Sequence, residues 1–308
     1  MSYSELYRKQ VSLLVKTLPC VDQEQCFALK GGTAINLFVR DLPRLSVDID
    51  LTYLPIDSRA QSLLGIENAL LRIANTISES NKQVHITRSA PRSQKEITKL
   101  VIRTKDRVQI KIEVTPVLRG CVYEPKRLAV CQTVEEEYGY AEIKVLSFAD
   151  LYAGKIMAAL DRQHPRDLFD VYHLFKNEGI TEELRTAVIV YLISHDHSPH
   201  SLLAPAMRDI SQDFEQNFVG MSGSDVSLNT LCATRDKLIG EVAGNMPDHH
   251  KAFLRSFYNR SPDWALLGLD HVRDLPAVKW REMNLDRSGA GTCEALLRKL
   301  EAAMIPKI

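Results

Sequence analysis

Two short groups of residues near the start of the chain have the types and spacing for chemistry on phosphates. Gly31-Gly32-Thr33 comes first, and Asp48 and Asp50 follow about fifteen residues later. The backbone N–H groups of two glycines can approach a phosphate closely, because no side chain stands in the way. Thr33 can cap a following helix, whose N-terminus favours anions. We therefore predict a phosphate-binding turn at Gly31, Gly32 and Thr33.

The two aspartates belong to a segment in which apolar and polar residues alternate, from Leu45 to Tyr53. Strict alternation indicates a half-buried strand and places Asp48 and Asp50 on one face, about 6–7 Å apart. Two carboxylates so close repel each other unless a cation or water lies between them. Magnesium suits such a pair, since it is usually held by one or two carboxylates and by substrate phosphates. The alternative is a solvated strand face without a metal.

A third carboxylate, Glu113, lies on the polar face of a second alternating segment, from Arg107 to Thr115. If this strand adjoins the first, Glu113 stands beside Asp48 and Asp50. Three carboxylates on adjacent strands can hold two metal ions about 3.5–4 Å apart. Alternatively, Glu113 is a surface residue paired with Lys111 or another neighbour.

A further group of charged residues follows Ser147, which begins a capping-box sequence and predicts a helix start near Phe148. Lys155 falls in the apolar stripe of this helix, where a lysine rarely lies without a partner. We expect its ammonium to reach a buried anion, interpreted as a triphosphate, rather than to extend to solvent. Asp167 and Asp170 then share one edge of a helix that begins at Pro165. Acidic residues in a first turn are also favoured by the helix dipole alone.

The elements that must position these residues change in type along the chain. Helices are expected at 5–18, 33–39 and 59–78, and strands at 25–30, 45–53, 83–88, 96–104, 108–116 and 142–145. Almost everything after residue 147 is expected to be helical. The sequence thus predicts an α+β fold with a small mixed sheet and flanking helices in residues 1–146, followed by a mainly α-helical domain in residues 147–308.

Composition excludes some classes of protein. The 308 residues have a formal net charge of zero and are 45% hydrophobic, as expected of a globular chain. No apolar run approaches the roughly 18 residues that a membrane span requires, and the N-terminus lacks the pattern of a signal peptide. Six scattered cysteines fit reduced thiols. We expect a cytoplasmic protein without membrane contact.

One segment is strongly basic although the whole chain is neutral. Between Lys82 and Lys111 there are nine lysines and arginines but only two acidic residues. Such a concentration indicates a phosphate-binding surface, with Arg88, Arg92, Lys95 and Lys99 as candidates for contact with an RNA backbone. The alternative is an ordinary solvated surface.

Taken together, these motifs resemble a known family. The pattern of GGT, then RLSVDID, then Lys155, Arg162 and RDLFD at 166–170 resembles the AbiEii/MenT-type nucleotidyltransferase toxins of type IV toxin–antitoxin and abortive-infection systems. The resemblance implies a nucleotidyltransferase-like fold in which the helical domain contributes Lys155 and the RDxxD motif to the cleft. It also implies that Gly32, Thr33 and Ser46 lie at the nucleotide phosphates, that Asp48 and Asp50 bind metal, and that Lys155 and Asp167 are catalytic.

The same resemblance implies an activity. Such toxins transfer a nucleotide from a nucleoside triphosphate with release of pyrophosphate, some of them to the 3′ end of tRNA, which blocks translation. Two Mg²⁺ ions and a cognate antitoxin, often with a winged-helix domain, are implied as partners. Two alternatives stay open: transfer to a protein or to a small molecule such as an antibiotic, and a module that binds nucleotide or RNA without turnover.

Overall fold

The structure is a computed structural model that describes residues 5–91, 95–223 and 225–305. The chain divides into two compact units, Met1–Ser147 with Val219–Asp225, and Phe148–Phe218 with Val226–Ile308. The sequence placed a single boundary between residues 146 and 147. In the structure the first unit also takes in a short segment from much later in the chain.

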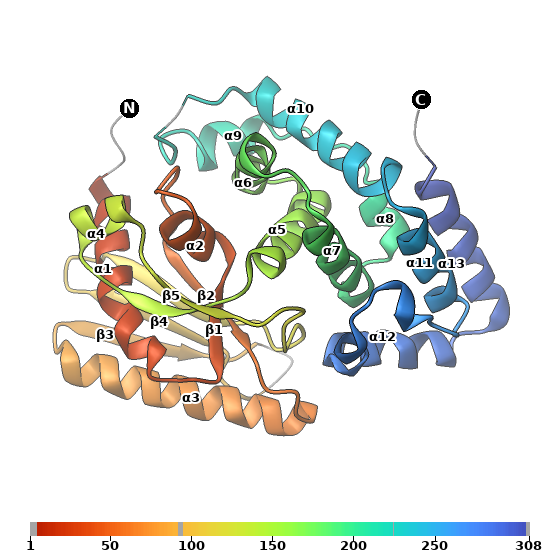
Figure 1. Cartoon of the computed structure of the whole chain (residues 1–308). Helices are drawn as coiled ribbons and strands as arrows, with labels where there is room; N and C mark the ends of the chain where they lie inside the picture. The colour runs from red at the N-terminus through yellow and green to blue at the C-terminus, as the bar shows by residue number, and fades with distance from the viewer. Residues whose placement is uncertain (1–4, 92–94, 224, 306–308) are drawn as a thin grey trace. The chain divides into compact units, whose positions relative to one another are not determined.

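The first unit contains a sheet with helices (Figure 1). Its helical elements are α1 (Glu5–Asp22), α2 (Gly31–Ala34), the π-helix η1 (Ile35–Val39), α3 (Arg59–Ser80) and α4 (Gln132–Tyr138). Its strands are β1 (Phe27–Lys30), β2 (Asp48–Tyr53), β3 (Val84–Ser89), β4 (Lys99–Thr104), β5 (Gln109–Val114), β6 (Lys126–Ala129) and β7 (Glu142–Val145). The sequence did not predict β6 and α4.

The seven strands form one mixed sheet in the order β3-β4-β5-β2-β1-β7-β6. β2 pairs with β5 and β1 pairs with β7 in parallel, whereas the other neighbouring pairs are antiparallel. The predicted mixed sheet is therefore confirmed. β2 and β5 are neighbours although about 55 residues separate them in the chain, as the prediction for Glu113 requires.

The two faces of β4 and β5 differ sharply. Leu100, Ile102, Ile110 and Ile112 are almost fully buried on one face. That face packs against helices, since α3 contacts β3 and β4 and α1 contacts β5 and α3. The apolar side of α3 recurs at helical spacing, and Ser58 caps its first turn by accepting a hydrogen bond from the N–H of Gln61. The alternate residues of both strands point to the opposite face, which carries polar side chains.

The strand expected at 45–53 is shorter in the structure, because β2 begins only at Asp48. The residues before it pair instead with the late segment of the first unit. Arg44 forms an isolated bridge with Ser222, and the N–H of Leu45 donates to the carbonyl oxygen of Met221 at 2.9 Å. Ser46 consequently lies in the connection that enters β2.

The second unit is helical throughout, as the sequence predicted. It contains α5 (Phe148–Arg162), α6 (Pro165–Asn177), α7 (Glu182–Ser194), α8 (Pro199–Leu203), α9 (Ser211–Asn217), α10 (Leu228–Ile239), the π-helix η2 (Gly240–Gly244), α11 (Asp248–Tyr258), the short 3-10 helices η3 (Trp264–Leu266) and η4 (Asp270–Asp274), α12 (Pro276–Arg287) and α13 (Ala290–Ala303). α5 packs against α6 and α7, with Tyr152 and Phe169 fully buried. Among the described helices, none has the length and apolar character to cross a membrane.

We predict that Gly65→Ala destabilises the first unit although alanine favours helix. A Cβ at Gly65 would collide with the hydroxyl of Tyr53. Tyr53 is buried and packs edge-on against Phe27, so its ring cannot move freely. We expect a loss of about 1–3 kcal/mol in the free energy of unfolding, measured by urea denaturation.

Gly240→Ala is the matched control, because Gly240 is exposed at a helical position with nothing near its Cβ. Helix propensity should make this variant more stable by about 0.5–1 kcal/mol. Equal effects of the two substitutions would contradict the packing argument.

Candidate active site

The glycine turn that begins α2 lies directly against charged and polar side chains. Gly31 has φ +76°, and a Cβ there would lie 2.7 Å from Oδ2 of Asp50. A Cβ at Gly32 would lie 2.7 Å from Nη2 of Arg44 and 2.9 Å from Oγ of Ser46. A Cβ at either position would force these side chains to move, and at Gly31 the backbone conformation also favours glycine.

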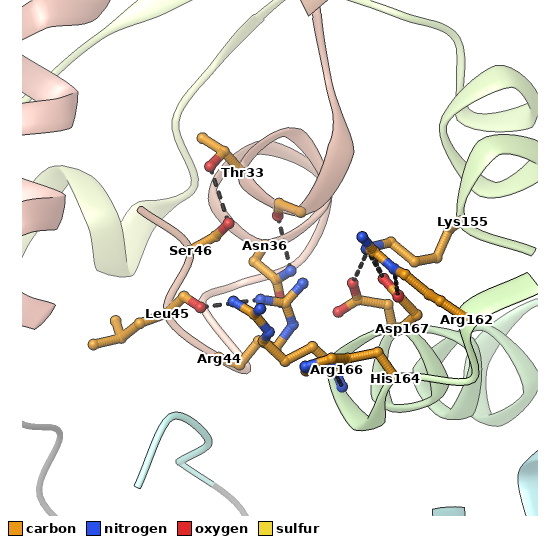
Figure 2. A network of polar contacts seen from close by, with 12 residues as sticks. Thr33, Asn36, Arg44, Leu45, Ser46, Lys155, Arg162, His164, Arg166 and Asp167 are labelled. Carbon is orange, nitrogen blue, oxygen red and sulfur yellow. Dashed lines mark hydrogen bonds and ion pairs between the residues drawn. The ribbon is translucent and has the colours of Figure 1, made fainter. Parts of the chain in front are cut away.

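Thr33 does not cap the helix, contrary to the prediction. α2 begins at Gly31 after Lys30, so Thr33 lies inside it and is fully buried. Its hydroxyl donates to the backbone carbonyl oxygen of Asp48 and lies 3.0 Å from the hydroxyl of Ser46 (Figure 2). Thr33 thus ties the glycine turn to the first residue of β2.

The sheet register places the three predicted acidic residues on one face. Glu113 of β5 lies directly beside Asp50 of β2, and Asp48 lies beside Lys111. Residues opposite each other on paired strands point to the same side. Asp48 and Asp50 are half-buried, whereas Glu113 is exposed.

Lysines lie on both sides of this acidic group. Lys30 of β1 is the register partner of Asp50, and its Nζ donates to Oγ1 of Thr115 at 3.1 Å. Lys99 of β4 is the register partner of Glu113, with 3.1 Å between Nζ and Oε2. Burial lowers the pKa of Lys30, although the charges of Asp50 and Glu113 act to raise it. Four neighbouring strands therefore carry the sequence of charges Lys30, Asp50, Glu113 and Lys99.

The acidic face fits a divalent cation by its donor chemistry. It offers carboxylate oxygens, which magnesium prefers, on adjacent strands. In the described residues, the only groups of three potential ligands within 4.8 Å of one another lie elsewhere, at Glu182, His249 and His250 and at His195, Asp196 and His197. Magnesium does not need three converged carboxylates, because water and substrate phosphates complete its shell.

Arg44 is a residue of this region that the sequence reasoning missed. It is 3% exposed, and its Nη1 donates to the carbonyl oxygen of Leu45 at 3.0 Å. Its guanidinium lies against Gly32, since a Cβ added at Gly32 would be 2.7 Å from Nη2 of Arg44. A buried arginine supports a turn built to receive anions. Its place in the RLS sequence before the aspartates was a signal that could have identified it.

The second unit contains a separate, buried cluster around Lys155. Nζ of Lys155 lies 2.8 Å from Oδ1 of Asp167 and 3.0 Å from Oδ2 of Asp170. All three side chains are at least 93% buried. The predicted buried anion is therefore present, but it consists of these two carboxylates from α6. The helix is positioned by Pro165 at its first turn and by His164, whose Nδ1 accepts from the N–H of Arg166 at 3.1 Å.

Arg162, at the end of α5, completes this cluster. Its Nε lies 2.6 Å from Oδ2 of Asp167 and its Nη2 lies 3.0 Å from Oδ1, a bidentate contact (Figure 2). Burial acts to raise the pKa of Asp167, but Lys155 and Arg162 hold it well below its ordinary value. Asp167 is therefore a stable carboxylate at neutral pH.

The sheet separates the predicted RNA-binding residues. Lys99 shares the polar face with Glu113, whereas Arg88 is the register partner of Leu100, which is buried on the opposite face. Lys95 is exposed in the connection before β4. Arg92 lies outside the described residues. Only Lys99 of this set is thus placed on the strand face that carries the carboxylates.

Comparison with known proteins identifies the family. The family described as nucleotidyl transferase AbiEii toxin, of type IV toxin–antitoxin systems, matches residues 12–279, which is most of the chain. The chain belongs to the AbiEii family of nucleotidyltransferase toxins. The match extends well beyond residues 25–180, on which the resemblance of the motifs depended. No curated protein matched in a separate search.

A solved structure supports the fold. MenT4, a nucleotidyltransferase toxin from Mycobacterium tuberculosis, is similar with a TM-score of 0.57 and 16% sequence identity, over 96% of this chain and 93% of that chain. At this identity the likeness concerns the fold. Membership of the AbiEii family makes the protein a nucleotidyltransferase, with a nucleoside triphosphate as substrate and an antitoxin as partner.

We predict that Gly31→Ala impairs activity by displacing Asp50. The new Cβ would lie 2.7 Å from the Asp50 carboxylate, and φ of +76° is unfavourable for alanine. Nucleotidyl transfer should fall by more than about tenfold, because small misplacements of a reacting group are costly. The measurement is the initial rate at increasing metal concentration.

Gly139→Ala is the control for backbone strain alone. Gly139 has φ +98° but nothing within 4 Å of a Cβ. This variant should lose about 1 kcal/mol of stability and keep its rate. A similar loss of rate in both variants would exclude a specific effect on Asp50.

We predict that Lys155→Met strongly destabilises the second unit. It leaves Asp167 and Asp170 buried without their shared cation, which typically costs about 3–5 kcal/mol. Urea unfolding followed by tryptophan fluorescence reports on this unit, since Trp264 and Trp280 both lie in it.

Arg162→Ala is the comparison, because the Arg162 side chain is 60% exposed and its removal should cost at most about 1 kcal/mol.

The lowered pKa of Asp167 makes the stability of the second unit depend on pH. The stabilisation by this carboxylate is present above its ordinary pKa of 3.8 and is lost as the pH falls through the lower folded value. The stability difference between the wild type and Asp167→Asn should therefore shrink under acidic conditions, and a constant difference would contradict the charge argument.

Proposed function

We propose that this AbiEii protein is a metal-dependent toxin that transfers a nucleotide from a nucleoside triphosphate to RNA, with the 3′ end of tRNA as acceptor, and so blocks translation. The observation that carries the proposal is the acidic face of the sheet. Asp48 and Asp50 follow the glycine turn on β2, and Glu113 lies in register beside Asp50. The family supplies the reaction class.

In this proposal Asp48 and Asp50 hold magnesium, and Glu113 completes the site for a second ion. The bound metal would neutralise phosphate charge and activate the attacking oxygen. Lys30 and Lys99 place positive charge beside the carboxylates before metal binds, since Lys30 neighbours Asp50 and Lys99 neighbours Glu113. Lys99 must share Glu113 with any ion, which makes Glu113 the weaker ligand.

The glycine turn is the proposed site for the nucleotide phosphates. Gly31 and Gly32 present backbone without side chains, and Ser46 lies against Gly32. Thr33 fixes the turn to β2 through the Asp48 carbonyl. Arg44 adds a buried positive charge behind Gly32. Catalysis in such a site consists mainly of positioning and charge stabilisation.

Lys155 and Asp167 are assigned to catalysis by their match to the family motifs. The pKa of Asp167 supports a particular role within that assignment. A general base works best with a pKa near the working pH, whereas Lys155 and Arg162 keep the pKa of Asp167 far below it. We therefore propose that Asp167, with Asp170, positions the ammonium of Lys155 and does not act as a general base.

The partners in this proposal are a nucleoside triphosphate, tRNA and an antitoxin, with a winged-helix protein as the expected kind. Triphosphates and tRNA occur in the cytoplasm, so the proposal places the toxin there.

The test is a labelling assay with purified protein, magnesium, each α-labelled nucleoside triphosphate and total bacterial RNA, resolved on a denaturing gel. We expect label in the tRNA band. Asp48→Asn should reduce it by at least about 10²–10³-fold, because the isosteric amide removes a charge that the transition state requires. Chelation of the metal should have the same effect.

Asp106→Asn is the matched control, since Asp106 is exposed in the turn between β4 and β5. It should label tRNA at the wild-type rate. Label on protein or metabolite fractions alone would overturn the RNA acceptor and keep the reaction class. Transfer that survives Asp48→Asn undiminished would overturn the proposed metal site.

A further inference from the structure

The polar face of the sheet continues past the carboxylates to the edge strand β3. Across β5 and β4, Lys111 is the register partner of Val101, and Gln109 is the partner of Arg103. On β3, Ser89, Thr87 and His85 are the partners of Lys99, Val101 and Arg103. The three residues of β3 and their three partners on β4 therefore share the face of Asp48 and Asp50.

Charge is distributed unevenly over this face. The acidic side chains lie on β2 and at the end of β5, at Asp48, Asp50 and Glu113. Toward the edge the charged side chains are Lys111, Lys99 and Arg103, and β3 contributes none that is acidic. Lys111 lies beside Asp48. Arg103 on β4 is the diagonal neighbour of Lys111, and about 7–8 Å separates the Cα atoms of Lys111 and Arg103. A line of positive charge thus leads from Asp48 toward the sheet edge.

Lys111 has no ion pair or hydrogen bond to its side chain among the residues that the structure describes. Lys99, by contrast, is held by Glu113 at 3.1 Å. Arg103 donates to Oε1 of Gln109 at 2.6 and 3.2 Å, which orients its guanidinium on this face, and it is exposed. Toward the sheet edge, Lys111 and Arg103 are therefore cations of this face that form no ion pair within the described residues.

We propose that Lys111 and Arg103 bind consecutive backbone phosphates of a single-stranded nucleic-acid end and so lead its terminal hydroxyl toward Asp48. The spacing of about 7–8 Å suits two separate phosphates along an extended strand better than the compact triphosphate of one nucleotide. Spaced cations on one strand face suit a backbone contact that is independent of sequence. This inference rests on the proposed RNA acceptor and adds the surface that holds it.

The register also decides which basic residues do not take part. Arg88 is only one residue from Ser89 in sequence, yet it shares the opposite face with Leu100. The number of basic residues between Lys82 and Lys111 therefore exceeds the number on the face of Asp48 and Asp50, because alternate residues of a strand point to opposite sides of the sheet.

The test measures binding separately from turnover. A 5′-fluorescent single-stranded RNA of about 12 nucleotides is titrated with full-length protein and magnesium at several salt concentrations. Lys111→Gln and Arg103→Gln should each weaken binding about fivefold at ~0.1 M salt and reduce the slope of log K against log salt by about 0.7, as expected for one lost phosphate contact on a single strand. Lys111→Arg should restore binding.

Arg88→Gln is the matched control, because it removes the same charge from the other face of the sheet. Its RNA affinity should equal that of the wild type. Inorganic triphosphate, titrated by calorimetry, should bind Lys111→Gln as tightly as the wild type. Unchanged RNA affinity in the Lys111 and Arg103 variants, or equal loss in Arg88→Gln, would overturn the proposal. Loss of triphosphate affinity in Lys111→Gln would also overturn it and assign Lys111 to the nucleotide.

The outcome is distinguishable from failure of the proposed function. RNA that binds through Lys111 and Arg103 but receives no label from wild-type protein would leave this surface intact and overturn nucleotidyl transfer to RNA. Label in tRNA at wild-type levels in both variants, with unchanged affinity, would keep the transfer and overturn the surface.

Discussion

Repulsion between like charges is the constraint on which the first unit depends. Asp50 and Glu113 lie side by side on β2 and β5, with Asp48 two residues away. The sheet order places β1 and β4 on the outer sides of these strands, and each contributes a lysine in register. The two neighbouring carboxylates thus have a lysine on each outer side, so the acidic face can form in the absence of metal. Reordering the strands would separate the carboxylates from Lys30 and Lys99. The strand order therefore determines the arrangement of charges on this face.

The second unit also contains neighbouring carboxylates, but there they are buried together with a lysine. Lys155, Asp167 and Asp170 are buried, so water does not screen them, and desolvation is costly. Each charge is compensated by direct contact, and Arg162 supplies the remaining positive charge from a more exposed position. A cluster of this kind fixes the geometry of its members closely, since any rotation leaves a buried charge without a partner. The exposed acidic face can exchange ions with solvent, whereas this cluster cannot.

Local patterns in the sequence predicted much of the site, and long-range pairing explains the rest. Alternation in 45–53 and 107–115 identified the shared face of Asp48, Asp50 and Glu113, because side-chain direction in a strand is set by a period of two. The position of Lys155 in an apolar stripe required a buried anion, and two carboxylates supply it. The sequence did not show that β2 begins late, because residues 221–223 pair with the backbone just before it. It also assigned Thr33 a capping role, whereas α2 begins at Gly31 and the hydroxyl of Thr33 donates to the carbonyl oxygen of Asp48.

The segment Val219–Asp225 gives the chain an interleaved organisation. The polypeptide leaves the first unit after Ser147, returns to it at Val219, and leaves it again after Asp225. The connection that carries Arg44 and Ser46 pairs with residues of the late segment. These residues are translated only after Phe148–Phe218, which is more than a third of the second unit. A ribosome that has made only the sheet has not yet made the residues that pair with Arg44 and Leu45. The order of translation therefore sets a minimum length of chain, reaching into the middle of the helical unit, before the segment in front of β2 can acquire its native pairing.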